Sequence, residues 1–205
     1  MPQEPLITLA LIALTCAISI PAFTNQNLIA KLLFWSPAIA RGEVHRFVTH
    51  GFVHADGAHL LFNMITLYFF GRVMEPFFEQ YIGAIGYVLF YLSAIAVAIL
   101  PSYIQHRGDA NYRSLGASGA VSAVLFAYIL LAPWSMLFVF FFPLPAIVFA
   151  VAYTAYSFYA GRRGGGNINH SAHLWGAGYG ILFALCMEPA LAPHFLEQLM
   201  NPSFG

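Results

Sequence analysis

Long apolar runs separated by short polar segments dominate the chain, and this pattern predicts helices that span a membrane. A hydrocarbon core about 30 Å thick needs about 20 helical residues, and each span must satisfy its own backbone hydrogen bonds. We predict one transmembrane domain over residues 1–205, with spans at about 6–23, 59–78, 82–103, 115–131, 135–159 and 170–187. The predicted fold class is therefore all-α, a polytopic membrane protein with a six-transmembrane-helix bundle.

Two connecting segments have a distinctive composition. The segment from about 24 to 58 mixes basic residues with large apolar ones, which favours a structured loop at the membrane interface. The segment 161–169 contains two arginines and three consecutive glycines, so we expect it to be mobile. In the fifth span, Pro143 and Pro145 are expected to break or tilt the helix.

Composition supports a lipid environment. The chain is 60% hydrophobic and 8% charged, whereas soluble domains carry about 25% charged residues. Its formal net charge is zero and no basic patch indicates a nucleic-acid partner. Cys16 and Cys186 lie far apart in apolar stretches, and we interpret both as small buried hydrophobic residues.

Polar residues inside the predicted spans are the candidates for function, because such groups are costly in lipid and usually face the bundle interior. The fourth span opens on Gly116-Ala117-Ser118-Gly119. A serine at a helix N-terminus lies among unpaired backbone amides, which can stabilise an oxyanion beside its hydroxyl. The same residues also fit a small-residue packing motif whose serine bonds its own helix.

A histidine beside glycines opens the sixth span. His173, Gly176 and Gly180 fall on one helical face, so another helix can approach closely on the side that carries the imidazole. A neutral histidine can act as a general base toward a serine. The alternative is a histidine that is hydrogen-bonded to a neighbouring helix.

A third polar cluster opens the second span. His59 and Asn63 are four residues apart, so both project from the same helical face, and both are possible donors to an oxyanion. His45, His50 and His54 precede them. Clustered histidines can instead bind zinc or haem iron, although neither cysteine nor carboxylate accompanies these at ligand spacing.

A Ser-His-Asp triad would need an acidic partner for His173. Asp56 and Asp109 fall in predicted loops, and no glutamate lies within a helical turn of His173. The sequence therefore favours a two-residue dyad, in which packing and neighbouring polar groups orient the imidazole.

Together, these clusters resemble the rhomboid family of intramembrane proteases, in its minimal six-helix form and over nearly the whole chain. Three family patterns are matched, around the nucleophile, the catalytic histidine and the start of span two, by Gly116-x-Ser118-Gly119, Ala172-His173-x-x-Gly176-x-x-x-Gly180, and His54, His59 and Asn63. Two looser correspondences are His45-Arg46 in the first loop and Gly71 with Glu75 after span two.

The resemblance implies an intramembrane serine endopeptidase that cleaves transmembrane segments of protein substrates without metal or cofactor. Ser118 would be the nucleophile and His173 the general base. His59, Asn63 and the Ser118 amide would form the oxyanion hole, with Gly116 and His54 also assigned to the oxyanion and substrate-binding region. The implied partners are a transmembrane protein substrate and the lipid bilayer, with no nucleic acid.

The resemblance also implies a multi-pass protein of a bacterial inner membrane, with the loop after span five as a cap and span five as a lateral gate. A catalytically inactive rhomboid-like protein that binds membrane clients is the alternative, against which the presence of both Ser118 and His173 argues. The distribution of basic residues predicts that the active-site side faces the cytoplasm, whereas family members usually place it outside.

One position departs from the family pattern. Some bacterial members carry a tyrosine four residues after the nucleophile, packed on the catalytic histidine. Ser122 occupies that position here, so we expect a hydrogen bond or another aromatic residue to orient the imidazole.

Overall fold

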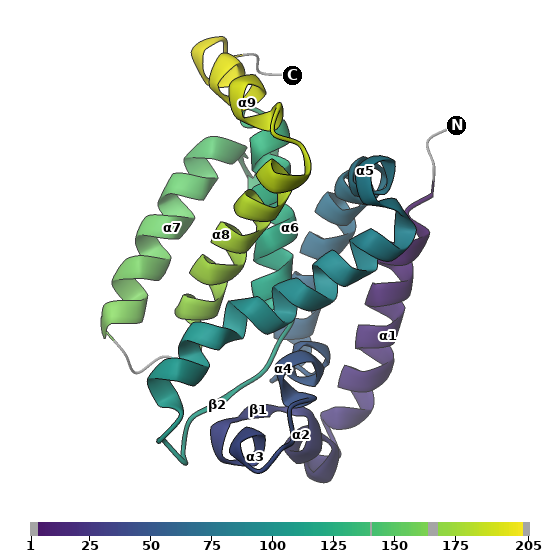
Figure 1. The fold of residues 1–205 in the computed structure, drawn as a ribbon, viewed down its shortest axis with the longest axis vertical. Helices are drawn as coiled ribbons and strands as arrows, with labels where there is room; N and C mark the ends of the chain where they lie inside the picture. Colours follow the sequence, from purple (N-terminus) through teal and green to yellow (C-terminus); the bar gives the residue numbers. More distant parts are fainter. Residues whose placement is uncertain (1–3, 140, 164–167, 203–205) are drawn as a thin grey trace.

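The computed structural model describes residues 4–139, 141–163 and 168–202, and these are predominantly helical. The long helices are α1 (Leu6–Ala22), α5 (Gly57–His106), α6 (Ser118–Leu131), α7 (Ala146–Arg163) and α8 (His170–Met187). In Figure 1, α6 runs through the middle of the bundle, with α5, α7 and α8 around it.

The central helix is buried on nearly every side. All residues from Gly119 to Ala127 are buried, as are Ile129 and Leu130. This explains why α6 is apolar around its whole circumference, since a helix without a polar face has no side suited to water.

Helix α5 covers the second and third predicted spans and is broken at Gly83. Gly83 has φ +68° and ψ 173°, which is outside the helical region. Phe78 and Phe90 would lie about 18 Å apart along a straight helix, yet their ring centroids are 4.4 Å apart. The two halves of α5 therefore fold back on each other at Gly83.

Close backbone contact joins α6 to α8. A Cβ added at Gly176 would overlap the carbonyl of Gly119, and one added at Gly180 would overlap the carbonyl of Ala123. Only glycines on α8 permit this approach, which places the first turns of the two helices beside each other.

A buried carboxylate holds the start of α1. Glu75, which is 2% exposed, accepts hydrogen bonds from the backbone amides of Ile7 (2.9 Å) and Thr8 (2.6 Å). Amides in the first turn of a helix have no acceptor within the helix. Glu75 therefore supplies acceptors from α5 and ties α1 to the bundle.

Short elements fill the connection between α1 and α5. They are α2 (Gln26–Leu32), β1 (Phe34–Trp35), α3 (Ser36–Ala40), α4 (Arg46–Thr49) and the 3-10 turn η1 (His50–Phe52). Strand β1 pairs antiparallel with β2 (Arg113–Ser114), in the register Phe34↔Ser114 and Trp35↔Arg113. This ladder links the first loop to the segment just before α6.

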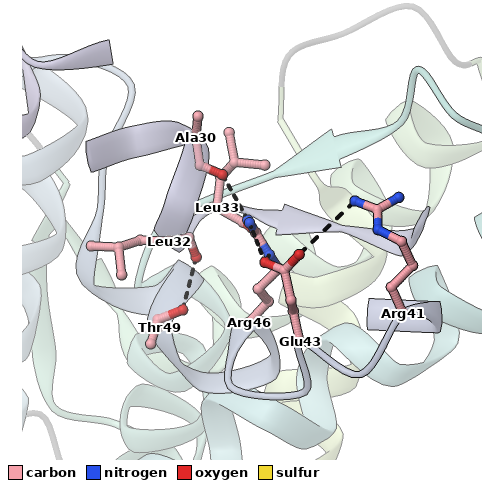
Figure 2. Close-up of polar contacts among 7 residues, drawn as sticks. All are labelled: Ala30, Leu32, Leu33, Arg41, Glu43, Arg46 and Thr49. Carbon is pink, nitrogen blue, oxygen red and sulfur yellow. Dashed lines mark hydrogen bonds and ion pairs between the residues drawn. The ribbon is translucent and has the colours of Figure 1, made fainter. Parts of the chain in front are cut away.

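Arg46 organises this first loop, as Figure 2 shows. Its guanidinium is buried and donates to the carbonyls of Ala30 (2.8 Å) and Leu33 (2.7 Å). It also donates twice to one oxygen of Glu43, at 2.9 and 2.7 Å. The hydrogen bonds from Arg46 hold the pKa of Glu43 below its usual range.

The fifth predicted span is partly wrong. Strands β3 (Met136–Val139) and β4 (Phe142–Pro145) pair antiparallel, and α7 begins only at Ala146. Pro143 and Pro145 therefore lie in a strand and do not kink a helix. Proline is tolerated in a two-stranded ribbon because both strands are edges.

The two cysteines differ in their exposure. Cys16 is partly buried and Cys186 is exposed, so the prediction that both are buried is wrong for Cys186. The expected mobility of segment 161–169 rests on its glycines, and residues 164–167 lie outside the described part of the chain; α7 extends to Arg163.

By length and composition, α5 is the one helix within the described ranges that can cross a membrane unaided. The pair formed by α8 and α9 (Leu191–Met200), bent by 113°, passes the same test as a unit. Helices α1 and α6 are apolar but shorter, with 17 and 14 residues.

Candidate active site

Ser118 and His173 meet where α6 and α8 begin. Ser118 is the first residue of α6, and His173 lies in the first turn of α8. The Ser118 hydroxyl oxygen is 2.7 Å from Nε2 of His173, and both side chains are partly buried. A hydroxyl and an imidazole at this distance can exchange a proton.

The loop before Ser118 is held by backbone hydrogen bonds to the first-loop region. Gly116 has φ +114°, and its amide donates to the carbonyl of His50 at 2.9 Å. A Cβ at Gly116 would lie 2.6 Å from the His59 ring. Glycine at this position therefore allows both the left-handed turn and the contact with His59.

His50 and His54 hold this loop through hydrogen bonds to Gly116 and Ala117. Nδ1 of His50 donates to the carbonyl of Arg46 at 2.9 Å. Nε2 of His54 accepts from the Ala117 amide at 3.2 Å, so its Nδ1 carries the proton and donates to Ser19 at 2.9 Å. Burial lowers the pKa of His50 to about 4 and that of His54 to about 3, so both rings are neutral at pH 7.

This geometry bears on the expected oxyanion role of His54. The side chain is fully buried and both ring nitrogens are occupied, by Ala117 and Ser19. A ring with no free donor cannot bind an oxyanion. His54 instead fixes the backbone next to Ser118, and its ring is not available as an oxyanion donor.

His59 and Asn63 lie one turn apart at the start of α5. Asp56 caps this helix by accepting from the His59 amide at 2.8 Å. Nδ2 of Asn63 donates to the carbonyl of His59 at 2.8 Å, and an amide nitrogen carries a second hydrogen. The His59 ring packs edge-on against the His54 ring, with centroids 5.0 Å apart.

Asn169 holds the start of α8 and was not identified from the sequence. Its side-chain oxygen caps the helix by accepting from the Ala172 amide at 3.0 Å. Its nitrogen lies 2.9 Å from the Tyr112 hydroxyl, 3.1 Å from that of Ser102 and 3.2 Å from that of Ser114. An asparagine one residue before a predicted helix is a cap signal, but its contacts with α5 and β2 arise only in the fold.

The sequence pattern also did not indicate Tyr153 of α7 as part of the site. Its ring stacks on the His173 imidazole, with centroids 5.9 Å apart and planes inclined by 17°. Its hydroxyl is 3.0 Å from that of Ser122. Nothing in the sequence distinguishes Tyr153 from the other tyrosines of α7.

Clustered histidines are also possible metal ligands. Among the residues that the structure describes, no group of three His, Cys, Asp or Glu side chains is arranged to hold a metal ion.

Comparison with known proteins agrees with this architecture. Residues 41–189 match the family model of the Rhomboid domain. RHOMBOID-like protein 12, mitochondrial, of Arabidopsis thaliana is 32% identical over 169 residues, which cover 76% of this chain and 50% of that protein. The chain thus spans about half the length of this curated relative.

Two bacterial proteins are also similar. Rhomboid protease GlpG of Haemophilus influenzae is 31% identical over 131 residues, covering 61% of this chain and 62% of that protein. Putative rhomboid protease YdcA of Bacillus subtilis is 27% identical over 151 residues, which cover 73% of this chain and 71% of that protein. Since the family model covers well over half of the residues and agrees with the helical fold, the chain belongs to the rhomboid family of integral membrane proteins.

Proposed function

We propose that this protein is an intramembrane serine endopeptidase that cleaves transmembrane segments of protein substrates. The observation that carries the proposal is the 2.7 Å contact between the Ser118 hydroxyl and Nε2 of His173. The similarity to proteins named rhomboid proteases supports it. Retention of a hydroxyl and an imidazole in proton-transfer geometry also argues against the alternative of an inactive client-binding protein.

In the proposed reaction, Ser118 attacks the carbonyl carbon of the scissile peptide bond while Nε2 of His173 accepts the hydroxyl proton. His173 then gives that proton to the leaving amine, which releases one product and leaves an acyl-enzyme on Ser118. Water then attacks the ester carbonyl while Nε2 of His173 accepts its proton, and His173 returns that proton to the Ser118 oxygen as the acid product leaves. No metal or cofactor takes part in these steps.

The oxyanion of the tetrahedral intermediate needs donors beside Ser118. The Ser118 amide is at the N-terminus of α6, where backbone N–H groups lack helical acceptors. We assign His59 and Asn63 as the further donors, because the His59 ring lies against Gly116 and Asn63 retains a second amide hydrogen. We predict that His59→Ala or Asn63→Ala lowers kcat about 10- to 1,000-fold.

The proposed membrane arrangement has six spans: α1, the two halves of α5, α6, α7 and α8. The short α6 then lies within the protein and not against lipid, which its burial supports. The related proteins come from bacteria, mitochondria and chloroplasts, so residence in a bacterial inner membrane remains a prediction.

The dyad is tested with Ser118→Ala and His173→Ala in a cleavage assay on a model transmembrane substrate. Each should lower kcat by more than about 1,000-fold, because losing either partner disables the unit. Ser157→Ala is a matched control, since its buried hydroxyl has no hydrogen-bond partner among the described residues. Undiminished cleavage by either dyad variant refutes the proposal, and failure of a fluorophosphonate to label Ser118 favours the inactive client-binding protein.

A further inference from the structure

The ring of a histidine that acts as a general base must stay in one orientation. The hydrogen bond to Ser118 is not enough to fix the orientation of the His173 ring. Its Nε2 faces Ser118 at 2.7 Å. Within the described ranges, no carboxylate is hydrogen-bonded to its ring. Rotation about the Cβ–Cγ bond would turn Nε2 away from Ser118 and abolish proton transfer.

The Tyr153 ring lies where it can prevent that rotation. It is nearly parallel to the imidazole, at 17°, with a centroid distance of 5.9 Å. The Phe149 ring stacks on Tyr153 with an interplanar angle of 24°, and the Phe126 ring centroid lies 5.8 Å from that of Tyr153. These two rings restrict the movement of the Tyr153 ring. Turning the imidazole out of plane would direct its edge into the Tyr153 face.

Ser122 anchors this ring from the central helix. It lies one turn after Ser118 on α6, is 4% exposed, and its hydroxyl is 3.0 Å from that of Tyr153. The nucleophile and the anchor therefore belong to the same rigid, buried helix. The hydrogen bond between Ser122 and Tyr153 therefore fixes the position of the Tyr153 ring relative to Ser118.

We infer that Tyr153 is a positioning residue for His173, held in register with the nucleophile by its hydrogen bond to Ser122. This inference rests on the proposed protease function and deepens it. The ring works from α7, whereas Ser118 and His173 lie on α6 and α8. The competent orientation of the base thus requires a third helix to be in place.

Helix α7, which carries Tyr153, has little buried surface. Of its 18 residues, only Ala146, Ala150 and Ser157 are buried, whereas α6 is almost wholly buried. A helix with so little buried surface is among the easier elements to displace. If α7 moves outward, the stack on His173 and the bond to Ser122 separate together, and the base loses its orientation until α7 returns.

The test uses Tyr153→Leu, Tyr153→Met, Tyr153→Phe and Ser122→Ala in the full-length protein. Tyr159→Leu is the matched control, because Tyr159 is an exposed tyrosine on the same helix. Two rates are measured: kcat and KM for a transmembrane substrate, and the labelling rate of Ser118 by a small fluorophosphonate. The small probe reports activation of Ser118 without requiring a substrate helix to dock. Thermal unfolding gives the folded fraction.

We expect Tyr153→Leu and Tyr153→Met to lower kcat and the labelling rate together by about 10-fold, with KM within about 2-fold. Tyr153→Phe keeps the ring and should lose about 3-fold, and Ser122→Ala about the same. The double variant Tyr153→Phe/Ser122→Ala should lose no more than either single variant, because both remove one hydrogen bond. Tyr159→Leu should match the wild type.

Labelling of folded Tyr153→Leu and Tyr153→Met at the wild-type rate would overturn the inference. A loss in Tyr153→Phe equal to that in Tyr153→Leu would also overturn it, since the hydroxyl and not the ring would then matter. The proposed function fails in a different way: wild-type protein would not label, or Ser118→Ala would still cleave.

Discussion

Replacing Gly176 by alanine should separate the two helices that carry Ser118 and His173. A Cβ at this position would lie 2.7 Å from the carbonyl carbon of Gly119 and closer still to its oxygen. Carbon atoms in contact are normally about 3.5–4.0 Å apart, so α6 and α8 must separate by about 0.8 Å or more. Both neighbouring atoms belong to the backbone, so no side chain can move aside.

That separation would lengthen the contact between Ser118 and His173, which we propose to be catalytic. Added to the present 2.7 Å between Ser118 and His173, it gives about 3.5 Å, at which a hydrogen bond no longer forms effectively. A displacement of about 1 Å costs about 100-fold in rate, and overpacking costs about 1–3 kcal/mol of stability. We therefore expect Gly176→Ala to lower kcat about 100-fold and to lower the unfolding temperature.

The assay is cleavage of a transmembrane substrate in detergent, with fluorophosphonate labelling of Ser118 as a second readout. Gly178→Ala is the control on the same helix, because no described atom lies within 4 Å of a Cβ added there. It should leave kcat within about 2-fold and stabilise the helix by about 0.5–1 kcal/mol. If Gly176→Ala behaves like Gly178→Ala in both readouts, the close approach of α6 and α8 does not set the dyad distance.

Three further predictions concern stability. Arg46→Gln should lower the unfolding free energy by about 2–4 kcal/mol, since buried carbonyls lose a charged donor; exposed Arg41→Gln should change it by less than about 0.5 kcal/mol. Glu75→Gln should cost about 1–3 kcal/mol, because an amide NH₂ would face a backbone N–H of α1. His50 and His54 have pKa values lowered to about 4 and about 3, below the value of about 6.5 in an unfolded chain. The unfolded state therefore binds more protons below pH 6.5, and stability should fall by a few kcal/mol from pH 6.5 to 4.

Denaturation in detergent as a function of pH checks all three. Equal stabilities of the Arg46 and Arg41 variants would mean that the first loop does not depend on the buried guanidinium. An unchanged Glu75→Gln protein would show that one oxygen suffices to hold α1. A midpoint that is constant between pH 7 and 4 would contradict the burial of neutral His50 and His54.

Local patterns in the sequence predicted much of the helical architecture. Helix α8 covers the residues of the sixth predicted span, and α1 those of the first apart from its last residue. Periodicity suffices for these elements because a single helix determines which residues share a face. It also predicted that Ser118 begins a helix and that His173 shares a helical face with Gly176 and Gly180. Each of these features depends on a single helix.

The error in span five has a specific cause. Residues 136–145 are as apolar as a membrane helix, and an apolar run alone does not distinguish a helix from a hairpin. The alternation of prolines at 143 and 145 favours a strand, because a helix interior tolerates neither. The hairpin forms through cross-strand pairing of Met136 with Pro145, a contact between residues that a helical pattern would place on separate turns.

The sequence by itself determined which residues are candidates for chemistry, because residue type and helical spacing are local properties. Only the tertiary structure decided which of them meet: it brought Ser118 to His173 across 55 positions, occupied both nitrogens of His54, and placed Tyr153 of α7 against the imidazole. The first of these outcomes depends on how closely α6 and α8 approach each other, and the others on where α1, the first loop and α7 pack. The approach of α8 to α6 is set by glycines of α8 against the backbone of α6, a relation that the pattern of a single segment does not contain.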